Sequence, residues 1–321
     1  MNYLQYSKLE AMLESSPELF PPRSDRLVGS DRTVDSGYYD IVRFFGSDAV
    51  DPSRVGIRVE PGRYAIGDPL IKTYADSVAE RLRNQGRLYD GPTVTGLLAA
   101  DFRGTDPVLQ VQETSYGDFA GSCFALDMPH HLFREHGGTL RDYYLRTYAR
   151  DEITCRPLAN CLGVCGYVII EEAGRRFLLQ VVRAGNLATM AGSPGPSVAG
   201  SVDFRPDYTS VADIIQRSLG QEVEEELFLT RAEFRITPLA FARELFRADN
   251  PQLFALVHCT LTRQLLAERL SAIPERTREF AGFRFVALNS DNRLDAAAVA
   301  AVNFEARMSY YLAEEYLHFV G

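Results

Sequence analysis

The residues best suited to chemistry in this chain are four glutamates gathered in one short segment, QEVEEEL (221–227). The apolar residues before and within this segment recur at helical spacing, so we expect it to end a helix. Successive residues of an α-helix turn by about 100°, which places Glu222, Glu225 and Glu226 on one face and Glu224 away from them. Like charges this close repel one another, and a divalent cation would reverse that cost. Hard oxygen ligands suit Mg²⁺, with Mn²⁺ as an alternative, so the segment predicts a metal site.

The helix that must position these glutamates is predicted from about Thr209 to Leu227. Ser210 is a plausible N-cap, and Asp213 three residues later completes an S-x-x-D helix start. Asp213 therefore has a structural role that competes with a metal-binding one. The apolar stripe of the helix consists of Val211, Ile214, Ile215, Leu219, Val223 and Leu227.

The elements around this helix predict an α/β (α+β) fold with a mixed sheet covered by helices. Two apolar strands and a loop rich in Gly, Ser and Pro precede the helix, and three strands and two helices follow it. The predicted strands are 161–172, 175–183, 236–244, 252–261 and 283–288, the loop is 191–201, and the later helices are 263–273 and 295–319.

The first half of the chain reads as a separate α+β region, which we place at 1–155, before a second domain at 156–321. Its predicted helices are 1–15, 72–86 and 139–150, and a strand is predicted at 38–46. Two alternating runs, 93–102 and 107–116, form a predicted hairpin whose turn is 103–106.

The composition is that of a globular protein, with 321 residues, 46% hydrophobic and 24% charged. A net charge of −9 argues against broad contact with nucleic acid backbones. The chain has no apolar run of membrane-spanning length and no signal-peptide pattern at its start, so we expect no membrane partner and a cytoplasmic location. Five cysteines lack the paired spacing of a zinc site.

A strand, a Gly-rich loop and a helix ending in E-V-E-E-E resemble the Nudix hydrolases. Their box reads G-x5-E-x7-R-E-U-x-E-E-x-G-U, where U is aliphatic. Glu222 takes the first Glu of its second half, Val223 the aliphatic position, Glu225 and Glu226 the Glu pair, and Leu229 the last aliphatic position.

The chain departs from this box at four positions. Gln221 stands in place of the Arg and Phe228 in place of the Gly, while Asp213 and Asp207 fall where the upstream Glu and Gly belong. Gly200 is an alternative for that upstream Gly, with an insertion after it.

Two of these departures carry structural expectations. Arg217, one turn before Gln221, is predicted to replace the missing Arg in part. Phe228 predicts a helix exit without a left-handed residue.

Three further segments resemble the Nudix branch that cleaves UDP-glucose and UDP-galactose. They are TSYGDFAGS (114–122), FARELFRADNPQLFALVHCTLT (241–262) and REFAGFRFVAL (278–288). Within the first, Tyr116 and Phe119 are predicted to be core residues.

The resemblance implies a Nudix-type α/β/α sandwich and Mg²⁺-dependent hydrolysis of a small-molecule nucleoside diphosphate derivative. A UDP-sugar would give UMP and a sugar 1-phosphate. Glu222, Glu225 and Glu226 would be the metal ligands, with Glu225 also serving catalysis.

Other residues would complete the site. Glu279, just before the last strand, is the first candidate for a further catalytic glutamate, and Glu244 is the second. Glu244 is alternatively expected to contact the substrate. Arg183 would hold a phosphate or a pyrimidine oxygen. Gly200 and Ser201 would let the backbone approach the diphosphate.

Two alternatives stay open. The degenerate box also fits a Nudix fold that binds a nucleotide or nucleotide-sugar with little or no turnover. A pyrophosphatase for ADP-ribose or a dinucleotide is the other. The sequence leaves open the base, the sugar, the role of residues 1–90 and the oligomeric state.

Overall fold

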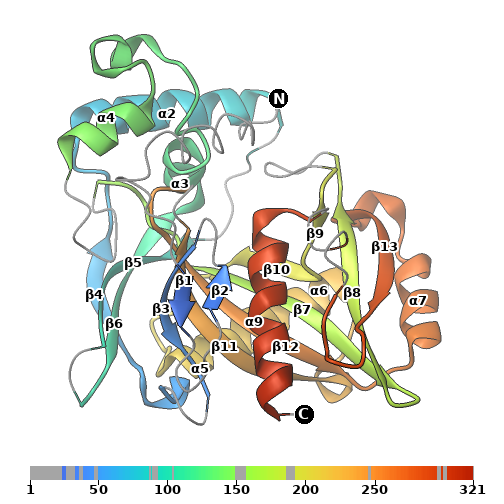
Figure 1. Cartoon of the computed structure of the whole chain (residues 1–321). Helices are drawn as coiled ribbons and strands as arrows, with labels where there is room; N and C mark the ends of the chain where they lie inside the picture. The colour runs from blue at the N-terminus through green and yellow to red at the C-terminus, as the bar shows by residue number, and fades with distance from the viewer. Residues whose placement is uncertain are drawn as a thin grey trace.

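The chain is built around a mixed eight-stranded sheet, seen here in a computed structural model (Figure 1). The described residues are 24–26, 33–35, 39–46, 50–86, 88, 93–102, 105–148, 157–185, 192–244, 247–294, 298 and 302–320. The strand order is β13-β8-β7-β12-β11-β3, with β10 paired to β7 and β9 to β8. The bounds are β3 Tyr39–Phe44, β7 Gly163–Glu172, β8 Arg175–Arg183, β9 Pro194–Gly195, β10 Val198–Ser201, β11 Phe234–Glu244, β12 Asn250–Cys259 and β13 Phe280–Ala287.

Strands β7 and β12 form the parallel centre of this sheet, with Val164 opposite Leu253 and Val168 opposite Val257. Eight successive residues of β7, from Gly163 to Ile170, are buried, as expected for a strand covered on both faces. The predicted mixed sheet is confirmed. Strands β9 and β10 lie inside the segment predicted to be a loop.

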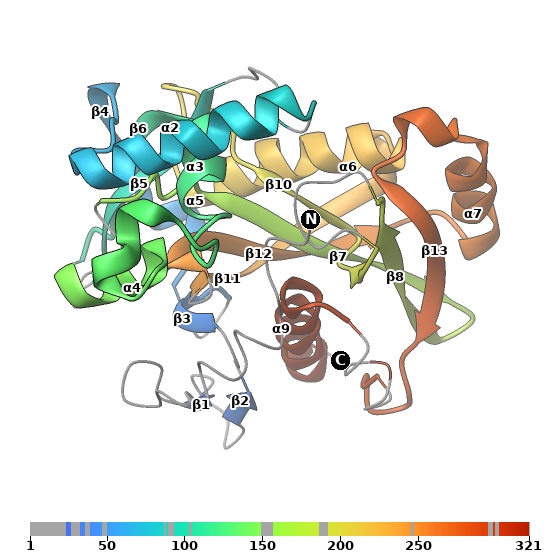
Figure 2. The ribbon, with the colours of Figure 1, turned by 90° about the horizontal axis from the view of Figure 1, so that it is seen from above.

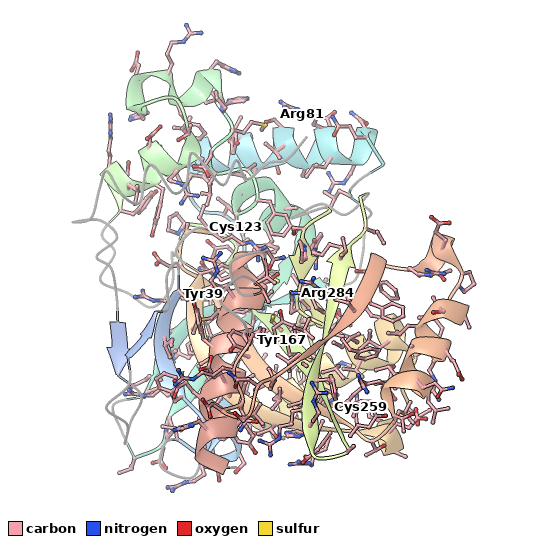
Figure 3. The ribbon with its side chains drawn as sticks, turned by 45° about the vertical axis from the view of Figure 1, so that its right-hand side comes forward. Tyr39, Arg81, Cys123, Tyr167, Cys259 and Arg284 are labelled. Atoms are coloured by element: carbon pink, nitrogen blue, oxygen red, sulfur yellow. The ribbon has the colours of Figure 1, made fainter. Side chains whose placement is uncertain are left out.

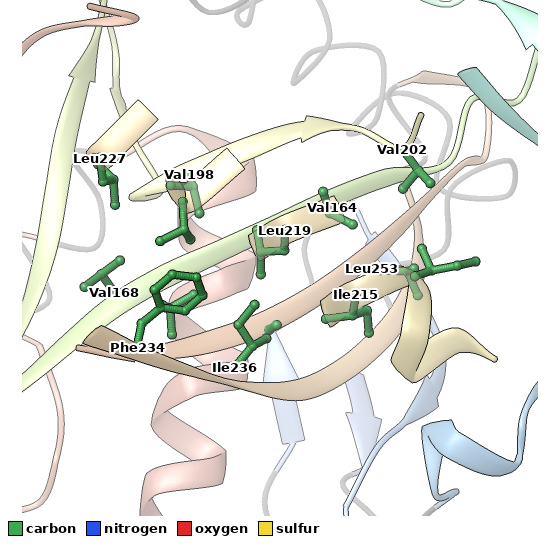
Figure 4. Packing of buried hydrophobic residues seen from close by; sticks show 14 of the residues in the cluster. Val164, Val168, Val198, Val202, Ile215, Leu219, Leu227, Phe234, Ile236 and Leu253 are labelled. Atoms are coloured by element: carbon green, nitrogen blue, oxygen red, sulfur yellow. The ribbon is translucent and has the colours of Figure 1, made fainter. Parts of the chain in front are cut away.

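One face of the sheet is covered by the helix that carries the glutamates. It comprises α5 (Val211–Ile214), a π-helical turn η3 (Ile215–Leu219) and α6 (Gly220–Leu227). Figure 4 shows Ile215, Leu219 and Leu227 packed with Val164 and Val168 of β7. These side chains belong to one buried cluster, which confirms the predicted apolar stripe.

The N-terminus of this helix is capped as predicted. The backbone N–H of Asp213 donates to Ser210 Oγ at 3.1 Å, and the N–H of Thr209 donates to the Asp213 carboxylate at 3.1 Å. The predicted helix is confirmed, and within it residues 215–219 form a π-helical turn that the apolar spacing did not indicate. Such turns occur mostly as single bulges and often near functional sites.

The other face of the sheet is covered by α9 (Phe304–Val320), opposite α5 and α6 (Figure 2). The predicted helix at 295–319 is interrupted, since Val302 and Asn303 are not helical, while residues 295–297 and 299–301 lie outside the described residues. Asn303 Oδ1 accepts from the N–H of Ala306 at 2.9 Å and so supplies the cap. Among the residues described here, no helix has both the length and the apolar character needed to cross a membrane.

Among its described residues, the N-terminal half holds a three-stranded sheet in the order β4-β6-β5, three α-helices and most of a buried cluster to which Cys161 and Ala248 also belong. The predicted hairpin is confirmed by the antiparallel pairing of β5 and β6, whereas residues 1–15 and part of the turn 103–106 lie outside the described residues. The bounds are β4 Gly56–Arg63, β5 Thr93–Asp101, β6 Val108–Ser115, α2 Pro69–Asn84, α3 Tyr116–Ser122 and α4 Leu140–Thr147. The minor elements are β1 Ser24–Arg26, β2 Thr33–Asp35, η1 Pro52–Arg54, η2 His131–His136, η4 Arg231–Glu233, α7 Arg263–Ala272 and η6 Glu275–Thr277.

Backbone bonds join the two sheets. The N–H of Thr95 donates to the carbonyl of Val202 at 2.8 Å, and the N–H of Leu162 donates to the carbonyl of Thr95 at 2.8 Å. In addition, β3 precedes the predicted boundary at residue 155 yet pairs with β11 in the main sheet. The division of the chain at this residue stays a prediction.

Replacing Glu233 by Gln is expected to lower the free energy of unfolding at neutral pH. Both Nη atoms of Arg269 donate to its carboxylate, at 2.6 and 2.9 Å, and the N–H of Thr230 donates at 2.8 Å. These bonds lower the pKa of Glu233 from 4.5 to about 2. The stabilisation is therefore complete above pH 4.5 and is lost as the pH falls toward 2. Solvent screening at this partly exposed pair reduces the expected effect to about 1 kcal/mol.

Urea unfolding at pH 7 and pH 3 tests this expectation. The Glu233→Gln variant should lose less stability between the two pH values than the unmodified protein. Asp207→Asn, which breaks a pair with 67% of the carboxylate side chain exposed, is the matched control and should change stability little. Equal acid sensitivity of the Glu233→Gln variant and the unmodified protein would contradict the assignment.

Candidate metal and diphosphate site

Glu222 lies on the helix within a group of interacting carboxylates. Its burial raises its pKa to about 8, together with the negative charges of Glu279, Glu225 and Asp203. Two of these neighbours come from other elements, because Glu279 precedes β13 and Asp203 follows β10. The structure thus brings Glu279 to the helical glutamates, as predicted.

Glu226 lies one helical turn from Glu222 and shares its surroundings. Burial and the charges of Glu222 and Glu279 raise its pKa well above the usual value, while Arg183 acts in the opposite direction. A group of buried like charges with one opposing guanidinium favours a cation as a partner.

Arg183 and Glu279 lie side by side at the edge of the sheet. Arg183 is the last residue of β8 and faces Phe280, the first residue of β13, in the strand register. The N–H of Ala184 donates to the carbonyl of Glu279 at 2.9 Å. The pairing of β8 with β13 therefore places the Arg183 guanidinium and the Glu279 carboxylate beside the glutamate helix.

Gly200 provides the space that the Glu222 side chain occupies. It lies on β10, opposite Val164 of β7, and a Cβ atom built on it would overlap the Glu222 carboxylate. Only a residue without a side chain fits there without displacing Glu222. The neighbouring Ser201 lies beside the thiol of Cys161 and lowers the pKa of that thiol against the larger effect of burial.

The two remaining glutamates of the segment differ in their partners. Glu225 is exposed and accepts a bond at its Oε1 from Gln221 Nε2 at 2.9 Å. Glu224 pairs with Arg231 at 3.0 Å, consistent with its predicted separation from the metal-binding face. The Arg231 guanidinium also donates to the carbonyls of Gln216 at 2.6 Å and Arg217 at 3.3 Å.

These last two bonds account for the π-helical turn in part. In a π-helix the backbone bonds run from i to i+5, and a carbonyl at the bulge needs another donor. Arg231 supplies that donor from outside the helix. Its guanidinium lies against Gly220, where any Cβ atom would overlap it.

Two expectations attached to the box are wrong. Arg217 does not stand in for the missing Arg, because its guanidinium pairs with Asp207 at 3.0 Å and Asp213 at 3.5 Å. Phe228 does end the helix in the left-handed region, at φ 56°, with 48% of its surface exposed. A residue other than Gly or Asn is uncommon there, and the backbone of this position follows the Gly of the box although its side chain does not.

Glu244 belongs to a separate, fully buried network. Its Oε1 accepts from the hydroxyl of Tyr39 at 2.8 Å, and its Oε2 accepts from Arg247 at 2.9 Å. Arg247 in turn pairs with Glu305 of α9 at 3.5 Å. Both Glu244 oxygens thus have protein partners, and through them this residue joins β3, β11 and α9 away from the helical glutamates. Tyr39 of this network is labelled in Figure 3.

The sequence missed two residues of the site, Asp203 and Tyr116. Asp203 follows Ser201 by two positions, and its charge contributes to the raised pKa of Glu222. Burial raises the pKa of the Tyr116 phenol to about 12, and the charges of Arg183 and Glu279 act on it. Tyr116, at the start of helix α3, therefore lies within electrostatic range of Arg183 and Glu279.

The side chains fit a divalent cation by their chemistry. Among the residues that the structure describes, no group of three or more His, Cys, Asp or Glu side chains is arranged to hold a metal ion. Four carboxylates from three elements nevertheless interact electrostatically, and a hard cation prefers such oxygens. The side chain of Glu has three rotatable bonds, so each of these carboxylates can change position when a cation binds.

Comparisons with known proteins give no family for the whole chain. No family model matches it, and no curated protein matches it. Part of the chain is similar to the protein DR0079 of Deinococcus radiodurans, at 14% identity and a TM-score of 0.32, over 48% of this chain and 81% of that one. It is similar to the NUDIX domain of NrtR from Shewanella oneidensis, which was crystallised with ADP ribose, at 15% identity and a TM-score of 0.32, over 55% and 97%. It is also similar to an Ap4A hydrolase of C. elegans, at 12% identity and a TM-score of 0.30, over 50% and 98%. These scores are too low to assign an activity, so the function is argued from the site itself.

Proposed function

We propose that this protein is a Mg²⁺-dependent pyrophosphatase of the Nudix type, acting on a nucleoside diphosphate derivative. A UDP-sugar is the favoured substrate, giving UMP and a sugar 1-phosphate. The observation that carries the proposal is the pair Glu222 and Glu226, whose pKa values are raised by burial and by neighbouring carboxylates. Two buried carboxylates close together destabilise the ionised form of each other, and a bound cation would remove that repulsion.

Each residue of the site has a distinct proposed role. Glu222, Glu225 and Glu226 would hold the cation, which would supply positive charge at the diphosphate and make a water molecule more acidic. Arg183 binds phosphoryl oxygens with its planar guanidinium, where charge spreads in the transition state.

Glu279 is the proposed general base, because it lies next to Arg183 and interacts with both buried glutamates. It accepts a proton from water as the water oxygen bonds to one phosphorus atom, the bridging P–O bond breaks and the other phosphate leaves as an anion. Gly200 and Ser201 of β10 form the wall of the site, and Tyr116 approaches it from the N-terminal half.

Substrate hydrolysis in the presence of Mg²⁺ tests the proposal. We expect UMP and sugar 1-phosphate from UDP-glucose or UDP-galactose, measured by chromatography, and no product when EDTA removes the metal. ADP-ribose, dinucleotides and nucleoside triphosphates complete the panel. Preferred release of AMP from ADP-ribose or a dinucleotide would overturn the UDP-sugar part of the proposal and keep the hydrolase.

The same panel separates an enzyme from a binding protein. If no compound is cleaved with Mg²⁺ or Mn²⁺ while a nucleotide-sugar raises the melting temperature, the site binds its ligand without turnover. The departures Gln221 and Phe228 are the features of the chain that favour that second function.

A further inference from the structure

Gln221 occupies the box position where the family resemblance implies an arginine, and the structure gives it two charged neighbours. Its Nε2 donates to Glu225 Oε1 at 2.9 Å, and its Oε1 accepts from Arg205 Nη2 at 3.2 Å. Arg205 lies in the loop after β10, between Asp203 and the start of the helix. The amide thus bridges a guanidinium and a proposed metal ligand.

The other arginines near this helix have different partners. Arg217 pairs with Asp207 and Asp213 and lies over the ring of Tyr208, with its Cζ 5.0 Å from the ring centre. Arg231 pairs with Glu224 and donates to two helix carbonyls. Among the hydrogen bonds of the described residues, the guanidinium that reaches Gln221 is that of Arg205.

We propose that Arg205 and Gln221 together replace the missing arginine as positioning residues for Glu225. Arg205 supplies the positive charge, and Gln221 transmits its effect, because a carbonyl oxygen that accepts from a cation polarises the amide and strengthens its N–H donor. The bond to Oε1 fixes the Glu225 side chain and leaves Oε2 for a cation. This inference rests on the proposed metal site.

The geometry explains why glutamine suits this position. Gln has both an acceptor and a donor at its end, so it can bond to a guanidinium and a carboxylate at once. An arginine at 221 would face the Arg205 guanidinium and repel it. Conversely, a leucine at 221 would break both bonds while keeping a similar volume.

Binding of Mg²⁺ by titration calorimetry is the test, on the full chain. Partners that orient metal ligands commonly change affinity by about 10-fold to 100-fold. We expect Gln221→Leu and Arg205→Met each to weaken Mg²⁺ affinity by about 10-fold, and the double variant to be no weaker than either single one. Arg205→Met with Gln221→Arg should restore the affinity, because the charge then sits at the box position.

Arg217→Met is the matched control, since it removes the same charge from the same surface of the protein. Its Mg²⁺ affinity should stay within about twofold of the unmodified protein. Additive losses from Arg205→Met and Gln221→Leu, or an equal loss from Arg217→Met, would overturn the proposal.

A metal-free measurement separates this inference from the proposed function. Thermal unfolding in EDTA should show that Arg205→Met has a smaller effect in the Gln221→Leu background than alone, because the bond is already broken there. If the unmodified protein does not bind Mg²⁺, the metal site fails, and coupling in EDTA still supports the Arg205–Gln221 contact. If the coupling is absent in EDTA, the contact itself is refuted.

Discussion

Replacing Glu226 by Gln is expected to abolish turnover and, at the same time, to stabilise the metal-free protein. Loss of one carboxylate removes a cation ligand, for which we expect a fall in kcat on the order of 1,000-fold, about 4 kcal/mol of transition-state stabilisation. The gain in stability has a separate cause. Burial and the charges of Glu222 and Glu279 raise the pKa of Glu226 in the folded protein.

The sign of the stability effect follows from that raised pKa. The folded protein holds the proton of Glu226 more tightly than the unfolded chain does. Its contribution is therefore favourable at low pH and is lost as the pH rises through the folded-state pKa. The neutral amide avoids this loss, so at pH 8 in EDTA we expect a gain of about 1 kcal/mol in the free energy of unfolding.

Glu224→Gln is the control for both effects. It makes the same chemical change two residues earlier, at a carboxylate paired with Arg231 and directed away from the others. Its turnover should stay within about threefold, and its stability should not rise. Steady-state kinetics with Mg²⁺ and urea unfolding in EDTA measure the two quantities. Unchanged turnover of the Glu226→Gln variant would remove Glu226 from the metal site, whatever its stability.

The helix and its cap were predictable because their signals are local. Ser210 and Asp213 bond to backbone atoms within four residues, and the apolar stripe repeats at the period of one helix. The π-helical turn was not predictable in this way. It depends on Arg231, which reaches back to Gln216 and Gly220 from beyond the end of the helix.

The start of the last helix and the partner of the edge strand were also not predictable from local sequence. The predicted helix at 295–319 is broken at Val302 because the Asn303 side chain caps the helix that follows, and the alanine-rich composition of 296–301 gives no sign of this cap. The strand at 39–44 was recognised from its own residues. Its partner, β11, lies in the other half of the chain, and no local sequence pattern indicates which distant strand it pairs with.

The candidate site was predictable as far as one helix face extends. Periodicity separates Glu222 and Glu226 from Glu224, and the structure agrees with that separation. Asp203 was missed because its approach to the helix depends on the pairing of β10 with β7. The buried network of Glu244 was not predicted, because no local pattern distinguishes a carboxylate with two buried partners from an exposed one.

Gly200→Ala is expected to impair the site with little effect on folding. The new methyl group would overlap the Glu222 carboxylate, which is the end of a flexible side chain. Glu222 would rotate away at small cost, so we expect a change in unfolding free energy below about 1 kcal/mol. Mg²⁺ affinity should fall by at least about 10-fold and kcat/KM by about 100-fold, since a proposed ligand is displaced.

Gly282→Ala provides the control for this substitution. Gly282 lies on β13 near Glu279, and a Cβ atom built on it meets nothing within 4 Å. The control should keep its Mg²⁺ affinity and turnover. If Gly200→Ala behaves like it, Glu222 does not need the position it holds against β10.

A second substitution distinguishes a displaced ligand from a disturbed strand. Glu222→Asp shortens the side chain by one methylene and withdraws the carboxylate from β10. Alone, it should weaken Mg²⁺ binding, because the ligand no longer reaches its place. Combined with Gly200→Ala, it should bind Mg²⁺ more tightly than Gly200→Ala alone, because the overlap between the methyl group and the carboxylate is relieved. Calorimetry on the four proteins measures this, and an additive loss in the double variant would show that the alanine acts through the strand and not through Glu222.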